Sequence, residues 1–304
     1  MMDEDGALPY RGIRPMRGRI GTNGEDDGMR LQVAFVLQGG GSLTAPQVGM
    51  LRALTEAGIV PDLVVGSSAG ALNAVAYAAD PSPVGLAALE TLWLSMRRRS
   101  VARFSARTLA RAVVGRADGL FPNTALRDMI TSAWIPRRLQ ETAVPVHVVA
   151  ADLHTGEPVV LSSGDAVQAL LASTAFPGLY PPVMVGGRLL FDGGVAADAP
   201  VLQAEALGAD VTYLLPAATA DVIAVPRGPL PLAYHALGHV LESAVRKDLA
   251  AARGTVHVLP ATSSSAGNPV DFRGTVRLMS DGYRLATEWL ATVANSEPVT
   301  AEAV

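Results

Sequence analysis

The sequence predicts an α/β fold built on a mainly parallel sheet. Two short strands rich in β-branched and apolar residues are expected at residues 32–37 and 61–65, with one helix between them. A strand, a helix and a strand at this spacing form a βαβ unit, in which the two strands are parallel and the crossover is right-handed. Of the 304 residues, 49% are hydrophobic and only 17% are charged, which excludes a disordered or fibrous chain.

The helix of this unit has recognisable ends. We expect Thr44 to cap it, Gln47 to complete a capping box three residues later, and Pro46 to occupy the first turn. Gly58 is suited to the position just after the last turn, where the chain leaves a helix with positive φ. A turn at residues 66–70 then leads from the second strand into a second helix.

The later elements follow from the same patterns. Gly186 and Gly187 form a two-residue hairpin turn between short β-branched runs. The predicted strands after the second helix are 144–151, 158–162, 183–185, 188–191, 210–215 and 255–259. The predicted helices are 165–173, 199–207, 232–252 and 274–294.

One segment differs in charge from the rest of the chain. Residues 91–117 contain seven arginines and no acid, in a chain whose net charge is −4. Four of these arginines recur at every fourth residue and would form one basic helical stripe: Arg99, Arg103, Arg107 and Arg111. We expect one domain at residues 31–294, with a cap-like insertion at 91–130 that is arginine-rich at 97–116. Residues 1–30 are expected to be a disordered tail, and 295–304 a second tail.

Composition excludes several classes of function. The slightly acidic balance gives no general affinity for nucleic acid. The absence of cysteine excludes disulfides, thiolate metal sites and cysteine nucleophiles. No signal peptide is predicted, because residues 1–30 mix charges with Gly and Pro and contain no apolar run. No transmembrane helix is predicted, because Gly, Pro and polar residues interrupt each uncharged stretch. We therefore expect a cytoplasmic protein, soluble or peripheral to a membrane, with no metal and no cofactor.

The clearest chemical motif is Gly66-Ser67-Ser68-Ala69-Gly70, a G-x-S-x-G between a predicted strand and a predicted helix. A sharp strand-to-helix turn leaves the Ser68 hydroxyl clear of the backbone, and the glycines let neighbouring backbone approach closely. The helix N-terminus behind the serine favours developing negative charge. The alternative is an ordinary turn whose serines cap the helix.

A run of three glycines, Gly39, Gly40 and Gly41, follows the first strand. Successive glycines leave backbone N–H groups unshielded, which suits an anion site or an oxyanion hole. A dinucleotide fingerprint does not fit, because Thr44 stands where its last glycine is needed, and no Gly-Lys-Ser/Thr follows to make a P-loop. A flexible connector is the alternative.

A third motif, Asp192-Gly193-Gly194, ends the second hairpin strand. It places a carboxylate at a strand end, where Asp192 would be able to accept the proton of Ser68. A plain Asp-Gly turn is the alternative.

In this order the three motifs resemble the patatin-like phospholipase family. The likeness covers about residues 31–294 and includes LQGGGSLTAPQVGMLRAL, DLVVGSSAGALNA, ADLHTGEPVVLSSGDAVQALLASTAFPGLYPPVMVGGRLLFDGG and PVDFRGT. The resemblance implies a three-layer α/β/α sandwich with a mainly parallel central sheet. It also implies a lipid acyl hydrolase of phospholipase A, lysophospholipase or carboxylesterase type, with a lipid or ester as substrate.

The resemblance assigns a role to each motif. Ser68 is the expected nucleophile, Asp192 the expected base, and no catalytic histidine is implied. The oxyanion hole is expected at Gly39, Gly40 and Gly41, and motif support at Gly66, Gly70, Gly193 and Gly194. Two positions depart from the family pattern. Ser42-Leu43-Thr44 stands where a cation and a glycine often follow the glycine run, and Asp198 stands where asparagine is common.

Three alternatives remain open at this point. A lipid-binding or regulatory protein would keep the fold without turnover. A Ser–Asp–His hydrolase is allowed by chain order, because His235, His239 and His257 follow Asp192. However, His235 and His239 share a polar helical stripe, and His257 lies within a strand pattern. The arginine-rich residues 97–116 either contact an anionic membrane or form a solvated cap helix.

Overall fold

The structure is a computed structural model that describes residues 30–101, 118–133, 135–220, 228–264 and 269–295. In this part of the chain, an eight-stranded sheet has the order β5-β6-β3-β2-β1-β7-β9, with β4 also paired to β3. Strands β1, β2, β3, β7 and β9 pair in parallel, whereas β4, β5 and β6 are antiparallel additions. The strands are β1 Val33–Leu37, β2 Leu63–Ser67, β3 Val146–Asp152, β4 Pro158–Leu161, β5 Val183–Val185, β6 Arg188–Asp192, β7 Val211–Leu215 and β9 Thr255–Val258. A separate two-stranded pair joins β8 Thr219–Ala220 to β10 Ser263–Ser264.

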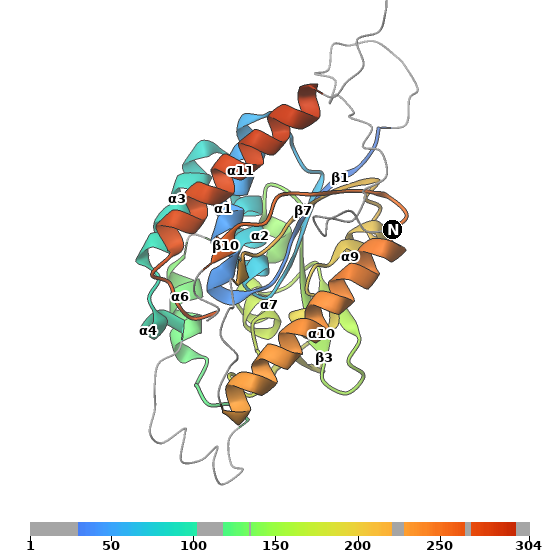
Figure 1. Ribbon diagram of the computed structural model, residues 1–304. Coiled ribbons are helices and arrows are strands. Elements are labelled where there is room, and N and C mark those ends of the chain that lie inside the picture. Colours follow the sequence, from blue (N-terminus) through green and yellow to red (C-terminus); the bar gives the residue numbers. More distant parts are fainter. Residues whose placement is uncertain (1–29, 102–117, 134, 221–227, 265–268, 296–304) are drawn as a thin grey trace, which may run out of the picture.

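Helices cover both faces of the sheet (Figure 1). On one face lie α1, α2, α3, α7 and α11, and on the other lie α8, α9 and α10. Their bounds are α1 Pro46–Glu56, α2 Ala69–Ala79, α3 Pro83–Ser95, α4 Arg98–Val101, α6 Thr124–Ser132, α7 Ala166–Ser173, α8 Gly194–Ala197, α9 Val201–Ala206, α10 Pro229–Ala251 and α11 Thr275–Asn295. Short 3-10 turns occupy Gly41–Thr44 and Leu139–Glu141.

Alternation along the central strand explains the three layers. Phe35 and Leu37 pack into the cluster beneath α1, α2 and α11, whereas Ala34 and Val36 pack into the cluster beneath α9 and α10. Successive side chains of a strand point to opposite faces, so a strand that is apolar at every position needs cover on both. The predicted α/β/α sandwich with a mainly parallel sheet is confirmed.

The local predictions hold for the βαβ unit, with one correction at the first helix. The chain leaves α1 through Gly58 at φ 74°, as predicted. The predicted capping box is wrong. Thr44 ends a 3-10 turn and its hydroxyl donates to the Gly41 carbonyl at 2.9 Å. The Gln47 amide donates to two main-chain carbonyls at the ends of β1 and β7, at 2.8 and 3.0 Å, so tertiary contacts replace the expected cap.

The hairpin is confirmed at its predicted position. Gly186 and Gly187 have φ values of 58° and 80° between β5 and β6. Two successive positive φ angles match the right-handed twist of a hairpin, and glycine adopts them without a Cβ clash. This hairpin carries β6, and with it Asp192, against β3.

The predicted cap-like insertion is only partly covered. It includes the end of α3, then α4 and α6. Arg97, Arg98 and Arg99 are exposed. Residues 102–117, which hold most of the arginine stripe, lie outside the described residues, as do the tails at 1–29 and 296–304. None of the described helices is long and apolar enough to cross a lipid bilayer.

Helices α1 and α11 cross at two glycines. A Cβ on Gly49 would stand 2.5 Å from the Tyr283 nitrogen and would clash with the Met279 carbonyl oxygen. A Cβ on Gly282 would clash in the same way with the Pro46 carbonyl.

Gly49→Ala is therefore expected to lower the free energy of unfolding by about 2–3 kcal/mol, because two backbones would have to separate. The matched control is Gly238→Ala in α10, where a Cβ meets nothing within 4 Å. There, alanine is expected to add about 0.5–1 kcal/mol through helix propensity. Urea unfolding of both variants measures the difference. Equal stability of Gly49→Ala and the parent would contradict the close crossing.

Candidate active site

Ser68 sits on a strained turn between β2 and α2. Its φ and ψ are 52° and −128°, and it has the only positive φ among the described non-glycine residues. Two glycines make room for this turn. A Cβ on Gly66 would stand 2.6 Å from the Ala71 Cα, and one on Gly70 would clash with the carbonyls of residues 37 and 38. The chain thus needs glycine on both sides of Ser68, and the serine remains partly accessible at the first turn of a helix.

Ser68 and Asp192 are brought together across 124 residues of sequence. The Ser68 hydroxyl donates to Asp192 Oδ2 at 2.7 Å, and the Gly194 N–H donates to Asp192 Oδ1 at 2.8 Å. Asp192 is the last residue of β6 and is only 2% exposed. Gly193 lets this strand end approach β3, because a Cβ there would clash with the Val149 carbonyl. The structure therefore presents a serine with a buried carboxylate in hydrogen-bond contact.

Burial changes the acidity of this carboxylate. It raises the pKa of Asp192 to about 7, against the hydrogen bonds from Ser68 and Gly194, which lower it. The negative charge of Asp198 raises this pKa further. A carboxylate that titrates near neutral pH is a stronger base, when ionised, than an exposed aspartate.

The glycine loop lies beside Ser68, with one correction to its predicted role. A Cβ on Gly39 would stand 3.2 Å from the Ser68 Cβ, so this residue is in contact with the serine. However, the Gly39 N–H donates to the Asp198 carbonyl at 2.9 Å and is not free for an oxyanion. Gly40 and Gly41 are partly accessible, at φ 146° and 60°, and their N–H groups have no acceptor among the described residues. They remain the candidate donors.

A buried polar network supports the loop from below. The Trp93 indole N–H donates to Asn73 Oδ1 at 2.7 Å, and Asn73 Nδ2 donates to Gln47 Oε1 at 2.9 Å. Gln47 in turn donates to the carbonyl of Gln38, the last residue before the glycines. Asn73 and Gln47 are fully buried, and this network satisfies them.

Two residues of the site were not predicted from sequence. Ser173, at the end of α7, accepts the Ser68 N–H at 2.9 Å and donates to the Val149 carbonyl at 2.6 Å, so it fixes the turn to β3. Gln38 donates through Nε2 to Asp198 Oδ2 at 2.8 Å. The sequence does offer a signal for each: Ser173 is a polar residue at the end of an apolar helix, and Gln38 is a polar residue between a buried strand and three glycines.

The histidines lie away from Ser68 and Asp192. His235 and His239 contact one another at 3.2 Å on exposed α10. His257 is on β9, which β7 and β1 separate from β2, and its ring packs 4.9 Å from that of Tyr213. Neither these three nor His147 and His154 bond to the serine or the aspartate. The Ser–Asp–His arrangement is therefore absent from the described residues. No group of three His, Asp or Glu side chains in the same ranges is placed to hold a metal.

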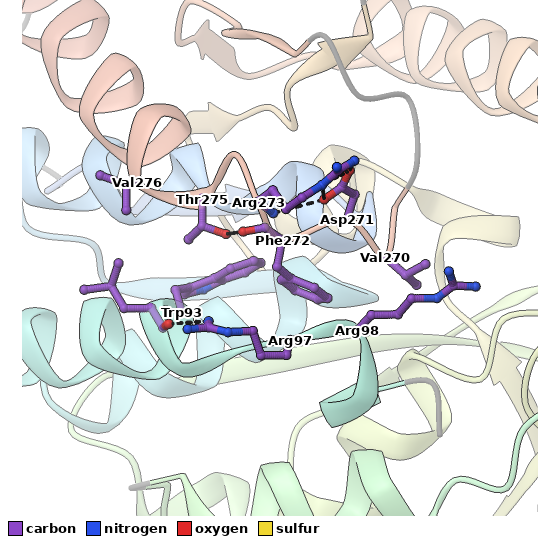
Figure 2. Close-up of a pocket in the computed structure, with 10 residues that line it drawn as sticks. Trp93, Arg97, Arg98, Val270, Asp271, Phe272, Arg273, Thr275 and Val276 are labelled. Atoms are coloured by element: carbon purple, nitrogen blue, oxygen red, sulfur yellow. Dashed lines mark hydrogen bonds and ion pairs between the residues drawn. The ribbon is translucent and has the colours of Figure 1, made fainter. Parts of the chain in front are cut away.

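A pocket of about 620 Å³ opens between the end of α3 and the start of α11 (Figure 2). Its wall combines the aromatic rings of Trp93 and Phe272 with charged side chains, including Arg98 and Arg273. Neither Ser68 nor Asp192 lines it. It adjoins the glycine loop through Pro269, whose carbonyl accepts the Ser42 N–H at 2.7 Å. The PVDFRGT stretch thus forms both a pocket wall and a support of the loop.

Fold and site together define an α/β protein with a serine on a strand-to-helix elbow and a buried carboxylate hydrogen-bonded to that serine. A profile described as patatin-like phospholipase matches residues 35–205, more than half of the chain, and the chain belongs to this family.

Curated relatives match part of the chain. An uncharacterized NTE family protein of Mycobacterium tuberculosis is 31% identical over 182 residues, which is 60% of this chain and 48% of the relative. Lysophospholipase nte1 of Aspergillus terreus is 30% identical over 189 residues, 62% of this chain and 12% of that protein. The chain thus spans about half or less of the length of these relatives.

Solved structures were also found to be similar. VipD of Legionella pneumophila has 14% identity and a TM-score of 0.44, over 86% of this chain and 67% of that one. ExoU of Pseudomonas aeruginosa, in complex with SpcU, has 15% identity and a TM-score of 0.45, over 86% of this chain and 52% of that one.

Proposed function

We propose that this protein is a serine-dependent lipid acyl hydrolase that cleaves carboxylic esters through a Ser68–Asp192 dyad. The observation that carries the proposal is the 2.7 Å hydrogen bond from the Ser68 hydroxyl to Asp192, made on a strained turn at the start of α2. A serine hydroxyl is a weak nucleophile until a base takes its proton, and Asp192 is the group in contact with it.

The steps of acylation follow from these contacts. Ser68 Oγ attacks the ester carbonyl carbon while its proton passes to Asp192 Oδ2. The carbonyl oxygen becomes an oxyanion, which the N–H groups of Gly40 and Gly41 and the N-terminus of α2 stabilise. The carbon–oxygen bond to the leaving alcohol then breaks, and Asp192 returns the proton to that alcohol. The product of this half-reaction is an acyl-enzyme at Ser68.

Deacylation repeats the same steps with water. Asp192 takes a proton from water as the water oxygen attacks the acyl carbonyl carbon. The ester bond to Ser68 Oγ breaks, and the proton passes from Asp192 to that oxygen. The free acid leaves, and the dyad returns to its starting state.

The proposed substrate class follows from the family. Family membership favours a lipid ester, and the Aspergillus terreus relative is named a lysophospholipase. We also propose that residues 97–116 contact an anionic membrane. This segment includes the exposed Arg97, Arg98 and Arg99.

The pH profile of hydrolysis tests the proposed base. Only ionised Asp192 accepts the serine proton, and burial raises its pKa to about 7. We therefore expect kcat/KM for a p-nitrophenyl ester to rise about tenfold per pH unit below about pH 7, and to level off above it. A flat profile between about pH 5 and 8 would contradict a base with this pKa.

Histidine also titrates in this range, so it needs its own control. Alanine variants of the exposed His154, His235 and His239 are expected to keep the same acid limb, because none of these histidines contacts the dyad. Loss of the limb in one of them would assign the titration to a histidine.

A further inference from the structure

Asp198 is a second carboxylate at the site, and it holds the start of the glycine loop. Its main-chain carbonyl accepts the Gly39 N–H at 2.9 Å, and its Oδ2 accepts from Gln38 Nε2 at 2.8 Å. The Gln38 amide oxygen also accepts the Ala217 N–H at 3.2 Å, so it is fixed from two sides. Asp198 thus bonds to both Gln38 and Gly39, where the chain passes from β1 into the glycine loop.

The same side chain approaches Asp192. Oδ1 of Asp192 and Oδ1 of Asp198 each lie 3.0 Å from the point where a Cβ on Gly194 would stand, so the two oxygens are at most 6.0 Å apart. Asp198 Oδ1 also lies 2.5 Å from the Cβ position of Gly39, and the Ser68 Cβ lies 3.2 Å from that point. The Asp198 carboxylate therefore fills space that two glycines leave open, next to the dyad.

The described side chains that bond to this pair or to Ser68 are neutral. They are Gln38 just after β1, Ser68 at the start of α2 and Ser173 from α7. Helix α10 packs against the cluster beneath α8 and α9 through apolar Val245 and Leu249. In the described ranges, neither aspartate forms an ion pair. Burial raises the pKa of Asp198 to about 6, and the Asp198 charge raises that of Asp192.

We propose that Asp198 is a positioning residue of the ester-cleaving site, which clamps the glycine loop against Ser68 and places a second buried carboxylate beside Asp192. A like charge at this distance favours the protonated form of Asp192. This inference rests on the proposed function. Asn in place of Asp198 would keep an oxygen for Gln38 and lose the charge. Ala would lose both.

Asp198→Asn is expected to move the acid limb of kcat/KM down by about one pH unit, because a like charge next to Asp192 disappears. Its plateau rate is expected to stay within a few-fold of the parent. Asp198→Ala is expected to lower the plateau kcat about tenfold further with little change in KM, because the loop loses the side-chain bond from Gln38 and keeps only the main-chain bond from Gly39. The matched control is Asp210→Asn, at the start of β7, where Asp210 Oδ2 accepts the Gln32 N–H at 2.8 Å, away from the loop. The acid limb of kcat/KM in Asp210→Asn is expected to lie at the same pH as in the parent.

A second readout is independent of turnover. Both carboxylates have a raised pKa in the folded protein, so the native state binds more protons than the unfolded state between about pH 4 and 7. The free energy of unfolding should therefore fall as pH rises through this range. In Asp198→Asn this fall should be smaller, because the raised pKa of Asp198 no longer contributes, and it should end at lower pH, because Asp192 then titrates without its charged neighbour.

The two readouts separate the two claims. Hydrolysis that is absent, or that persists without Ser68, would contradict the proposed function, and the unfolding experiment would still decide whether the carboxylates are coupled. An Asp198→Asn protein whose fall in the free energy of unfolding ends at the same pH as that of the parent would overturn the inference, whether or not the chain hydrolyses esters. An unmoved acid limb in an active Asp198→Asn enzyme would overturn it as well.

Discussion

Replacing Ser68 with alanine is expected to abolish ester hydrolysis, with a loss of about 10⁴-fold or more in kcat. The Ser68 hydroxyl is the one nucleophile in contact with Asp192 among the described residues, at 2.7 Å. Removing it leaves only the binding contacts and the oxyanion donors. Release of fatty acid from a lysophospholipid, or of p-nitrophenol from a short ester, measures the loss.

The chain supplies a matched control one residue away. Ser67 is fully buried, and its hydroxyl has no hydrogen-bond partner among the described residues. Ser67→Ala removes the same atoms without touching Asp192, and loss of an unsatisfied buried hydroxyl is neutral or mildly stabilising. We expect this variant to keep full activity. Equal activity in Ser68→Ala and Ser67→Ala would contradict the assignment of the nucleophile.

Replacing Asp192 with asparagine is expected to lower kcat about 10³–10⁴-fold, because the amide cannot accept the serine proton. The hydrogen bond from the Gly194 N–H survives, since the amide oxygen can still accept it. The loss is therefore expected in kcat, with a small change in KM. A variant that keeps most of its activity would show that another group is the base.

The same substitution is expected to stabilise the protein at alkaline pH. The pKa of Asp192 is raised in the folded state to about 7, so above that pH the native protein holds a buried charge that the unfolded chain exposes to water. Asparagine removes that charge, and we expect a gain of about 1–3 kcal/mol in the free energy of unfolding at pH 8. The gain should shrink as pH falls below about 7 and vanish only near pH 4, where the carboxyl is protonated in the native and the unfolded state alike. Urea unfolding at pH 8 and at about pH 4 measures the gain and its loss.

Much of the fold could be predicted because its signals are local. β-branched strands, helix-ending Gly58 and the Gly186-Gly187 turn each act through neighbouring residues, and each was found where expected. The dyad residues were expected from motifs at two strand ends, and the structure brings them into hydrogen-bond contact.

The remaining features depend on contacts between distant parts of the chain. Gly39 donates to a carbonyl 159 residues away and not to an oxyanion site. The Gln47 side chain donates to a main-chain carbonyl at a strand end and does not cap α1. Ser173 accepts a hydrogen bond from the Ser68 N–H, 105 residues away in the sequence. Each of these polar groups has several local partners that look equally good in the sequence. Tertiary packing decides which partner each one takes, and local patterns do not contain that information.

The most direct test of an activated Ser68 is reaction with a fluorophosphonate, in which Ser68 Oγ would displace fluoride and form a bond to phosphorus. Purified parent protein, Ser67→Ala, Ser68→Ala and Asp192→Asn would be treated in parallel, and any adduct located by peptide mass spectrometry. We expect an adduct on Ser68 in the parent and in Ser67→Ala, and none in the other two. A folded parent protein with no adduct, or an Asp192→Asn variant labelled at the parental rate, would contradict the dyad and favour a protein that binds lipid without cleaving it.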